Sequence, residues 1–182
     1  MLSLMTALAV GLAAQVAVPP AQTRTLENLP GVKLHPYVVT GQSSDAIQNS
    51  MKAALKAQPK TIGQLFTWTA SIHASQDTLG TVCTIKDATA ALDANVYLPQ
   101  LTDEAKIPAD DLRKWKPYQT GLRQQASDNL WFVADRLPTV ARSLVGKPCD
   151  QAAAVWNAGI TGLIAQQQAF DKQNQKKAAG KS

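Results

Sequence analysis

The segment Leu65-Phe-Thr-Trp-Thr-Ala-Ser-Ile-His73 decides the fold, because its side chains alternate in character along its whole length. One face consists of Phe66, Trp68, Ala70 and Ile72, and the other consists of Thr67, Thr69, Ser71 and His73. This alternation is typical of a strand with one buried face. A turn at residues 77–80 and a second run from Thr81 through Cys83 and Ile85 predict a hairpin. We expect its second strand to end at Leu98-Pro99.

Upstream of this hairpin, the sequence predicts one more strand and one helix. Residues 32–40 are rich in strand-forming side chains, and Pro36 favours an edge position because proline has no N–H to donate. Ser44 is a candidate N-cap for the helix, which Gln58-Pro59 would end. Its buried face recurs at helical spacing and consists of Ile47, Met51, Ala54 and Leu55.

Downstream of Pro108 the pattern becomes helical, with Pro117 and Pro138 expected to start or kink helical segments. The expected stripe consists of Leu112, Trp115, Leu122, Leu130, Val133 and Leu137. Asp150 can cap a last helix, whose expected face is Trp156, Ile160, Leu163, Ile164 and Phe170. The order of elements predicts an α+β fold, in which a small, mainly antiparallel sheet and one early helix pack on long C-terminal helices.

The composition fits one globular domain, which we place at residues 32–171. Of the 182 residues, 45% are hydrophobic and only 17% are charged. The net charge of +5 is concentrated after residue 171, in a segment whose lysines are Lys172, Lys176, Lys177 and Lys181. We expect residues 172–182 to be a basic, flexible tail, although such a tail could also bind anionic lipid or cell wall. Basic residues are not interleaved with aromatic ones, so no nucleic-acid partner is expected.

The first residues suggest export. Residues 2–14 are apolar and uncharged, too short to span a bilayer and suited to the apolar region of a signal peptide. We therefore expect a signal peptide at 1–20, a linker at 21–31, a periplasmic or secreted location, and no transmembrane segment in the mature chain. No Lys or Arg precedes the apolar run, and a buried N-terminal helix is the alternative, but Pro19-Pro20 ends the run abruptly.

The two cysteines, Cys83 and Cys149, are far apart and neither belongs to a metal-binding pair. In an exported chain, two lone cysteines favour one disulfide, which would stabilise the fold by about 3–4 kcal/mol. Two buried thiols are the alternative.

The run Trp115-Lys-Pro-Tyr118-Gln-Thr-Gly-Leu122 resembles the sequence that leads into the zinc helix of the DUF922 family, bacterial proteins described as predicted secreted zinc-dependent proteases. Further similar segments occur in the same order, and together they cover about residues 32–177. They are Tyr37–Gly41, Thr67–Thr69, Cys83 with Ile85, Leu98-Pro99, Cys149 and Gln166–Asp171. The resemblance implies a zincin-like scaffold and a zinc cofactor.

This chain departs from the family where the chemistry lies. A His-Glu-x-x-His helix holds zinc with two imidazoles one turn apart, and its Glu takes a proton from zinc-bound water. The corresponding positions here are Gln125, Ala126 and Asn129, or Gln124, Gln125 and Asp128 when the frame shifts by one. The family's later Thr and His-Gly correspond to Asn174, Lys176 and Lys177. Amides are poor zinc ligands and Ala126 cannot act as a base, so we expect no catalytic residue, no bound metal and no cofactor.

Other catalytic patterns are also missing from the sequence. His35 and His73 are far apart and have no partner at helical spacing, so we interpret both as surface residues. The sequence contains neither a Gly-x-Ser-x-Gly elbow nor a Gly-rich phosphate loop. Trp131 lies off the main helical stripe and is the best candidate for an exposed contact.

These observations favour an exported, non-catalytic relative of a zinc protease that acts as a binding or structural module. The partners we expect are a peptide or an envelope component. The polar face at residues 124–129 is then either solvent-exposed or part of a cleft that binds a peptide without cutting it. The alternative is a divergent metal-dependent peptidase or hydrolase with a relocated site, which would need His35 or His73 near Asp128 or Asp171.

Overall fold

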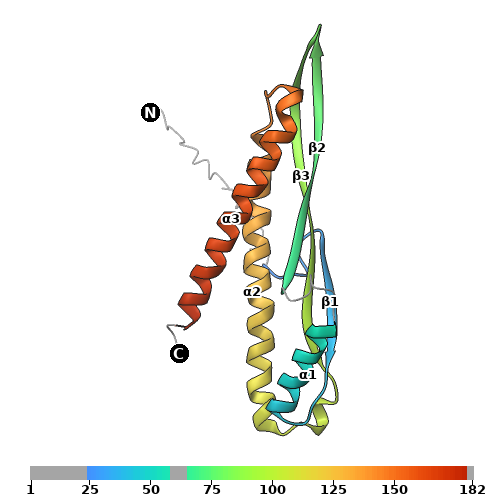
Figure 1. The fold of residues 1–182 in the computed structure, drawn as a ribbon, viewed down its shortest axis with the longest axis vertical. Helices are drawn as coiled ribbons and strands as arrows, with labels where there is room; N and C mark the ends of the chain where they lie inside the picture. The colour runs from blue at the N-terminus through green and yellow to red at the C-terminus, as the bar shows by residue number, and fades with distance from the viewer. Residues whose placement is uncertain (1–23, 58–64, 180–182) are drawn as a thin grey trace, which may run out of the picture.

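The computed structural model describes residues 24–57 and 65–179 and shows an elongated α+β fold (Figure 1). The predicted order of elements is confirmed. The elements are β1 (Val32–Val39), α1 (Ser44–Ala57), β2 (Phe66–Leu79), β3 (Val82–Leu101), α2 (Ala109–Arg142) and α3 (Ala152–Ala179), with short 3-10 helices at Glu104–Lys106 and Cys149–Gln151.

The sheet has three strands in the order β1-β3-β2. The predicted hairpin is present: β2 and β3 pair antiparallel from Leu79↔Val82 down to Phe66↔Val96, with a bulge at Ser75 and Gln76. Its turn is tighter than expected, because β2 continues through Leu79. The strand β1 pairs parallel with β3, so only one of the two pairings is antiparallel. As predicted, β1 lies at an edge, where Pro36 needs no second strand partner.

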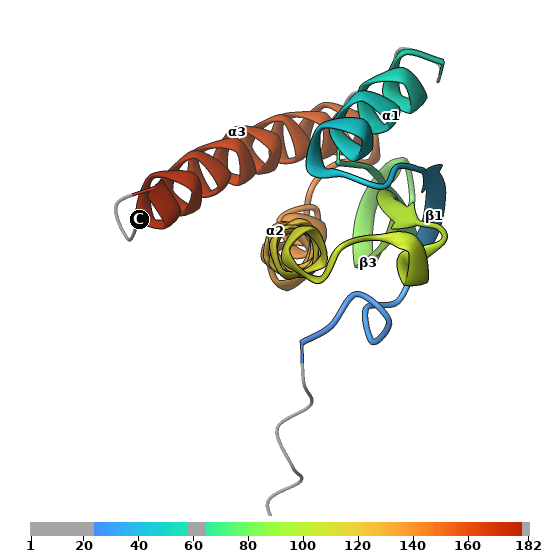
Figure 2. The ribbon, with the colours of Figure 1, turned by 90° about the horizontal axis from the view of Figure 1, so that it is seen from below.

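The helix α2 runs alongside the hairpin (Figures 1 and 2), and its buried side chains pack against those of β3 to form much of the core. Its Ala126 and Leu130 pack against Ala94, Val96 and Leu98 of the central strand. Neither Pro117 nor Pro138 starts a new helix, which was one of the two expectations, because α2 is one helix of 34 residues that contains both. A long buried face can outweigh the backbone hydrogen bonds that two prolines remove.

The helix α3 packs antiparallel on α2 and is covalently tied to the sheet. The predicted disulfide is present between Cys83 on β3 and Cys149 just before α3. Further along, the helices approach closely, since a Cβ added to Gly159 would lie 2.6 Å from Cγ1 of Val140. The helix continues through Ala179, so residues 172–179 are helical where a flexible tail was expected. Ala, Gln and Lys have high helix propensity, which explains the extension.

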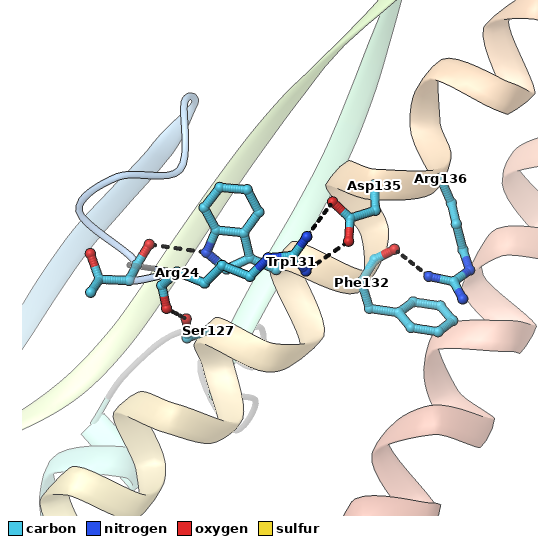
Figure 3. A network of polar contacts seen from close by, with 7 residues as sticks. Arg24, Ser127, Trp131, Phe132, Asp135 and Arg136 are labelled. Carbon is cyan, nitrogen blue, oxygen red and sulfur yellow. Dashed lines mark hydrogen bonds and ion pairs between the residues drawn. The ribbon is translucent and has the colours of Figure 1, made fainter. Parts of the chain in front are cut away.

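Residues 24–31, expected to be part of a linker, instead form a strap that packs on α2. Leu26 is 1% exposed and belongs to the core cluster around Leu130. Figure 3 shows the polar contacts, in which Ser127 Oγ donates to the carbonyl of Arg24 and Trp131 Nε1 donates to that of Thr25. The guanidinium of Arg24 pairs with Asp135 at 2.9 Å and lies over the Trp131 ring. Trp131 is therefore partly covered by the strap and half-buried, so it is less exposed than the sequence suggested.

Two smaller expectations concern the ends of elements. Ser43, not Ser44, caps α1, because Ser43 accepts from the backbone N–H of Ala46 through its hydroxyl, while Ser44 Oγ donates to Asp111. The predicted signal peptide at 1–20 lies outside the described residues. Within the described ranges, no helix is long and apolar enough to cross a bilayer.

Candidate functional site

The structure brings two of the degenerate motif positions into one hydrogen-bonded cluster between α2 and α3. Gln125 and Asn129 lie one turn apart on α2 and face Gln167, Asp171 and Gln175, which repeat every four residues on α3. We call these five residues the polar junction. Amide side chains suit these positions, because each of the four forms a hydrogen bond with a group on α2 or α3.

Asn129 is the centre of the polar junction and is fully buried, at 0% exposure. Its Nδ2 donates to the carboxylate of Asp171 at 2.9 Å and to the backbone carbonyl of Gln125 at 2.9 Å. Its Oδ1 accepts from Nε2 of Gln167 at 2.7 Å. Both amide hydrogens and the oxygen are used, so the burial of this side chain carries no unsatisfied group.

The carboxylate of Asp171 collects amide donors from both helices. Oδ1 accepts from Gln125 at 3.0 Å as well as from Asn129, and Oδ2 accepts from Gln175 at 2.7 Å. Hydrogen bonds to an ionised group each contribute about 1.5–3 kcal/mol. Among the described residues, the half-buried Asp171 makes no ion pair with Lys or Arg, so its partners within the protein are amide N–H groups.

The other motif positions do not join this cluster. Ala126 is fully buried and faces the sheet, among Ala94, Val96 and Leu98. Gln124 donates to Asp128 at 2.7 Å on the exposed side of α2.

Asn174 lies beside the junction, whereas Lys176 is exposed in the last turns of α3.

These residues do not suit zinc. The polar junction offers one carboxylate, already held by three amide N–H groups, and the remaining side chains are amides. Ala126, at the position where the resemblance would place a general base, is a methyl group inside the apolar core. In the described part of the chain, no three His, Cys, Asp or Glu side chains gather closely enough to hold a metal ion.

The histidines do not provide a relocated site. His35 lies on β1, where its ring stacks on Tyr97 and its Nε2 contacts Oδ1 of Asn95 at 2.8 Å. His73 is exposed on β2, at the opposite edge of the sheet, in register with Thr89. In the described residues, Asp128 and Asp171 accept hydrogen bonds from Gln and Asn side chains and from neither histidine.

Grooves flank the polar junction on both sides. One groove, of about 500 Å³, lies between the first residues of β2 and the middle of α3, where Thr67 and Trp68 oppose Ile164 and Gln168. A smaller groove, of about 260 Å³, lies on the other side and is lined by Gly121, Asp128 and Asn174, among others. Gln125 and Asp171 contribute to both grooves, so the junction forms the wall between them.

The sequence alone identified only part of the polar junction. It singled out Gln125 and Asn129 but missed Gln167 and Gln175, which complete the hydrogen bonding. A usable signal was present, because Gln167, Asp171 and Gln175 recur at i, i+4 and i+8 and must share one helix face. The sequence pattern does not show that this face of α3 packs against the face of α2 that carries Gln125 and Asn129.

The fold and the junction define an α+β protein whose mixed sheet is backed by two antiparallel helices joined through buried amides. The chain belongs to the DUF922 family, described as bacterial proteins of unknown function, whose model matches residues 34–178. No curated protein and no solved structure matches the chain.

Proposed function

We propose that this chain is an exported, non-catalytic member of its family that binds an extended polypeptide segment in the groove between β2 and α3. The observation that carries the proposal is the polar junction. Side chains that would hold a metal in a zinc protease are here replaced by amides whose hydrogen bonds are taken up by Asp171 and by one another. A cluster so fully paired supports a scaffold better than it supports proton transfer or metal binding.

The peptide groove is supported by the position of β2. This strand pairs only with β3 in the described sheet, so its outer edge presents backbone N–H and C=O groups to a partner. An extended peptide that adds to such an edge gains main-chain hydrogen bonds, and an adjacent groove supplies specificity. The groove is lined by Phe66 and Trp68 on one wall and by Gln168 on the other. Asp171 also lines it and favours a Lys or Arg side chain on the peptide.

Export is supported by two observations. The apolar N-terminal run has the length of a signal-peptide core. The disulfide between Cys83 and Cys149 is compatible with an oxidising compartment.

Zinc content and proteolysis test the non-catalytic part of the proposal. The purified chain, incubated with zinc and then dialysed against metal-free buffer, should retain much less than one equivalent of zinc. It should also leave casein uncut. One equivalent of zinc together with casein hydrolysis that EDTA abolishes would overturn it.

Peptide selection tests the binding part. A phage library of random decapeptides should enrich extended sequences with a basic residue, and the best of them, made synthetically, should bind in a fluorescence-polarisation assay. Thr67→Lys places a bulky cation in the groove and should weaken that peptide about tenfold or more. Thr69→Lys is the matched control, two residues along the same strand and outside the groove lining. Equal binding by both variants would contradict the assigned groove.

A further inference from the structure

A separate pocket lies between α1 and the first turns of α2 and shares no lining residue with the polar junction. We call it the α1–α2 pocket. It has a volume of about 320 Å³, at the small end of the range for ligand sites. One face of α1 and one face of α2 form its walls.

Two side chains that line this pocket have donors with poor pairing inside the protein: one donor is buried without a partner, and the other contacts only sulfur. Trp115 lines it and is 6% exposed, and its indole Nε1 has no hydrogen-bond partner among the described residues. Tyr118, one turn further on, donates its hydroxyl only to the thioether sulfur of Met51, at 3.6 Å. A thioether is a weak acceptor, and a buried donor without an acceptor is unfavourable by an amount comparable to a lost hydrogen bond. Burial raises the pKa of the Tyr118 phenol, so its hydroxyl keeps its proton and remains a donor.

The charges around the pocket favour an anion. Lys52 and Lys114 both line it, whereas Asp111 is its one acidic residue. Asp111 accepts from Ser44 Oγ at 2.5 Å and lies 3.9 Å from the ammonium of Lys114, so its charge is already partly compensated. Within the described residues Lys52 makes no ion pair, and the lining carries a net positive charge.

The remaining wall is apolar. Ile47 is buried and Met51 packs beside it, in the same hydrophobic cluster as Trp115. The Trp115 and Tyr118 rings also contact each other, with centroids 5.7 Å apart. The pocket therefore combines an apolar wall, an unpartnered indole N–H, a partly exposed phenol hydroxyl and excess positive charge, which is an arrangement suited to a small amphipathic anion.

We propose that the α1–α2 pocket binds a small monocarboxylate with an apolar body. Its oxygens accept hydrogen bonds from the Trp115 indole and the Tyr118 hydroxyl, Lys52 and Lys114 supply the opposite charge, and its apolar part packs on Ile47 and Met51. This site does not depend on the peptide groove, and neither proposal fails with the other.

The test uses the indole N–H signals of the full-length chain, with Trp115 assigned from the signal missing in Trp115→Phe. Titration with octanoate should move the Trp115 indole proton downfield, as expected for a new hydrogen bond, and leave the Trp68 and Trp156 signals in place. Octanol has the same chain without the carboxylate and should bind about tenfold more weakly or worse. No movement of the Trp115 signal at 10 mM octanoate, or equal binding of octanol, would overturn the proposal.

Two variants separate the site from general effects of charge. Lys52→Gln/Lys114→Gln should weaken octanoate binding several-fold, whereas Lys172→Gln/Lys176→Gln removes the same charge from the exposed end of α3 and should leave it unchanged. Equal loss in both would show nonspecific attraction and overturn the site. If Trp115→Phe fails to fold, the Trp115 signal is assigned by elimination from the Phe variants of the other three tryptophans. Tyr118→Phe should also weaken octanoate binding, and it should fold because Tyr118 is 44% exposed and its hydroxyl contacts only Met51.

Discussion

The two helix junctions along α2 differ in how their polar groups are paired. In the polar junction, around Asn129, buried donors and acceptors are matched between α2 and α3. In the α1–α2 pocket, around Trp115, a buried donor has no partner and the neighbouring hydroxyl meets only sulfur. A fully matched cluster holds helices together, whereas an unmatched one is poised to accept a ligand. The polar junction lies at the positions that the family resemblance singles out, whereas the α1–α2 pocket is distinguished only by its unpaired donor.

The largest expected change in stability comes from removing the disulfide that ties α3 to the sheet. Replacing Cys83 and Cys149 together by Ser should lower the free energy of unfolding by about 3–4 kcal/mol, because the unfolded chain loses a long closed loop. Urea unfolding with and without reductant measures it. Reductant should destabilise the parent chain and leave the double variant unchanged; an equal effect on both would contradict the disulfide's role.

The next effect tests whether the polar junction is structural. Asn129→Ala removes the buried amide, leaves Gln167 and Asp171 with unmatched groups, and should destabilise the protein by about 2–3 kcal/mol. The matched control is Gln124→Ala, on the same helix but on its exposed side, where a change within about 0.5 kcal/mol is expected. If the two variants unfold at the same urea concentration, the polar junction does not stabilise the fold in the way proposed.

A pair of glycines on α3 tests how closely this helix must approach α2. Gly159→Ala would push a methyl against Val140 and should destabilise by about 1 kcal/mol, despite the better helix propensity of Ala. Gly162→Ala meets nothing within 4 Å and should stabilise by about 0.5–1 kcal/mol. Thermal unfolding of both variants decides, and shifts in the same direction would refute the close contact.

The smallest effect belongs to the α1–α2 pocket. Tyr118→Phe removes a hydroxyl that contacts only a sulfur, so stability should change by no more than about 0.5 kcal/mol while octanoate affinity falls. Urea unfolding and the indole titration measure the two quantities. A loss of stability as large as that of Asn129→Ala would mean that this hydroxyl is structural.

The sequence predicted the fold well wherever a pattern repeats. Alternation from Leu65 to His73 identified β2 because a half-buried strand has a period of two, and the stripe through Leu130 and Val133 located the core face of α2. The partners of each element were harder to predict. The parallel pairing of β1 and the packing of residues 24–31 depend on contacts across the chain, which local pattern does not encode.

The same limit applies to the candidate site. Gln125 and Asn129 were identified through their place after the Trp115–Leu122 segment. Their partners on α3 lie about 40 residues away in sequence and meet them only because α2 and α3 pack antiparallel. The α1–α2 pocket gave no sequence signal, since a missing acceptor for Trp115 is a property of three-dimensional surroundings alone.

The disulfide also decides what a single proteolytic cut can do to the chain. Cys83 and Cys149 enclose a covalent ring that contains all of α2 and the exposed connection at residues 103–106. A single cut in that connection opens the ring without releasing a fragment, because the two cysteines lie on opposite sides of the cut. The nicked molecule would migrate as one species in a non-reducing denaturing gel and as two after reduction. The two pieces therefore stay covalently joined after such a cut.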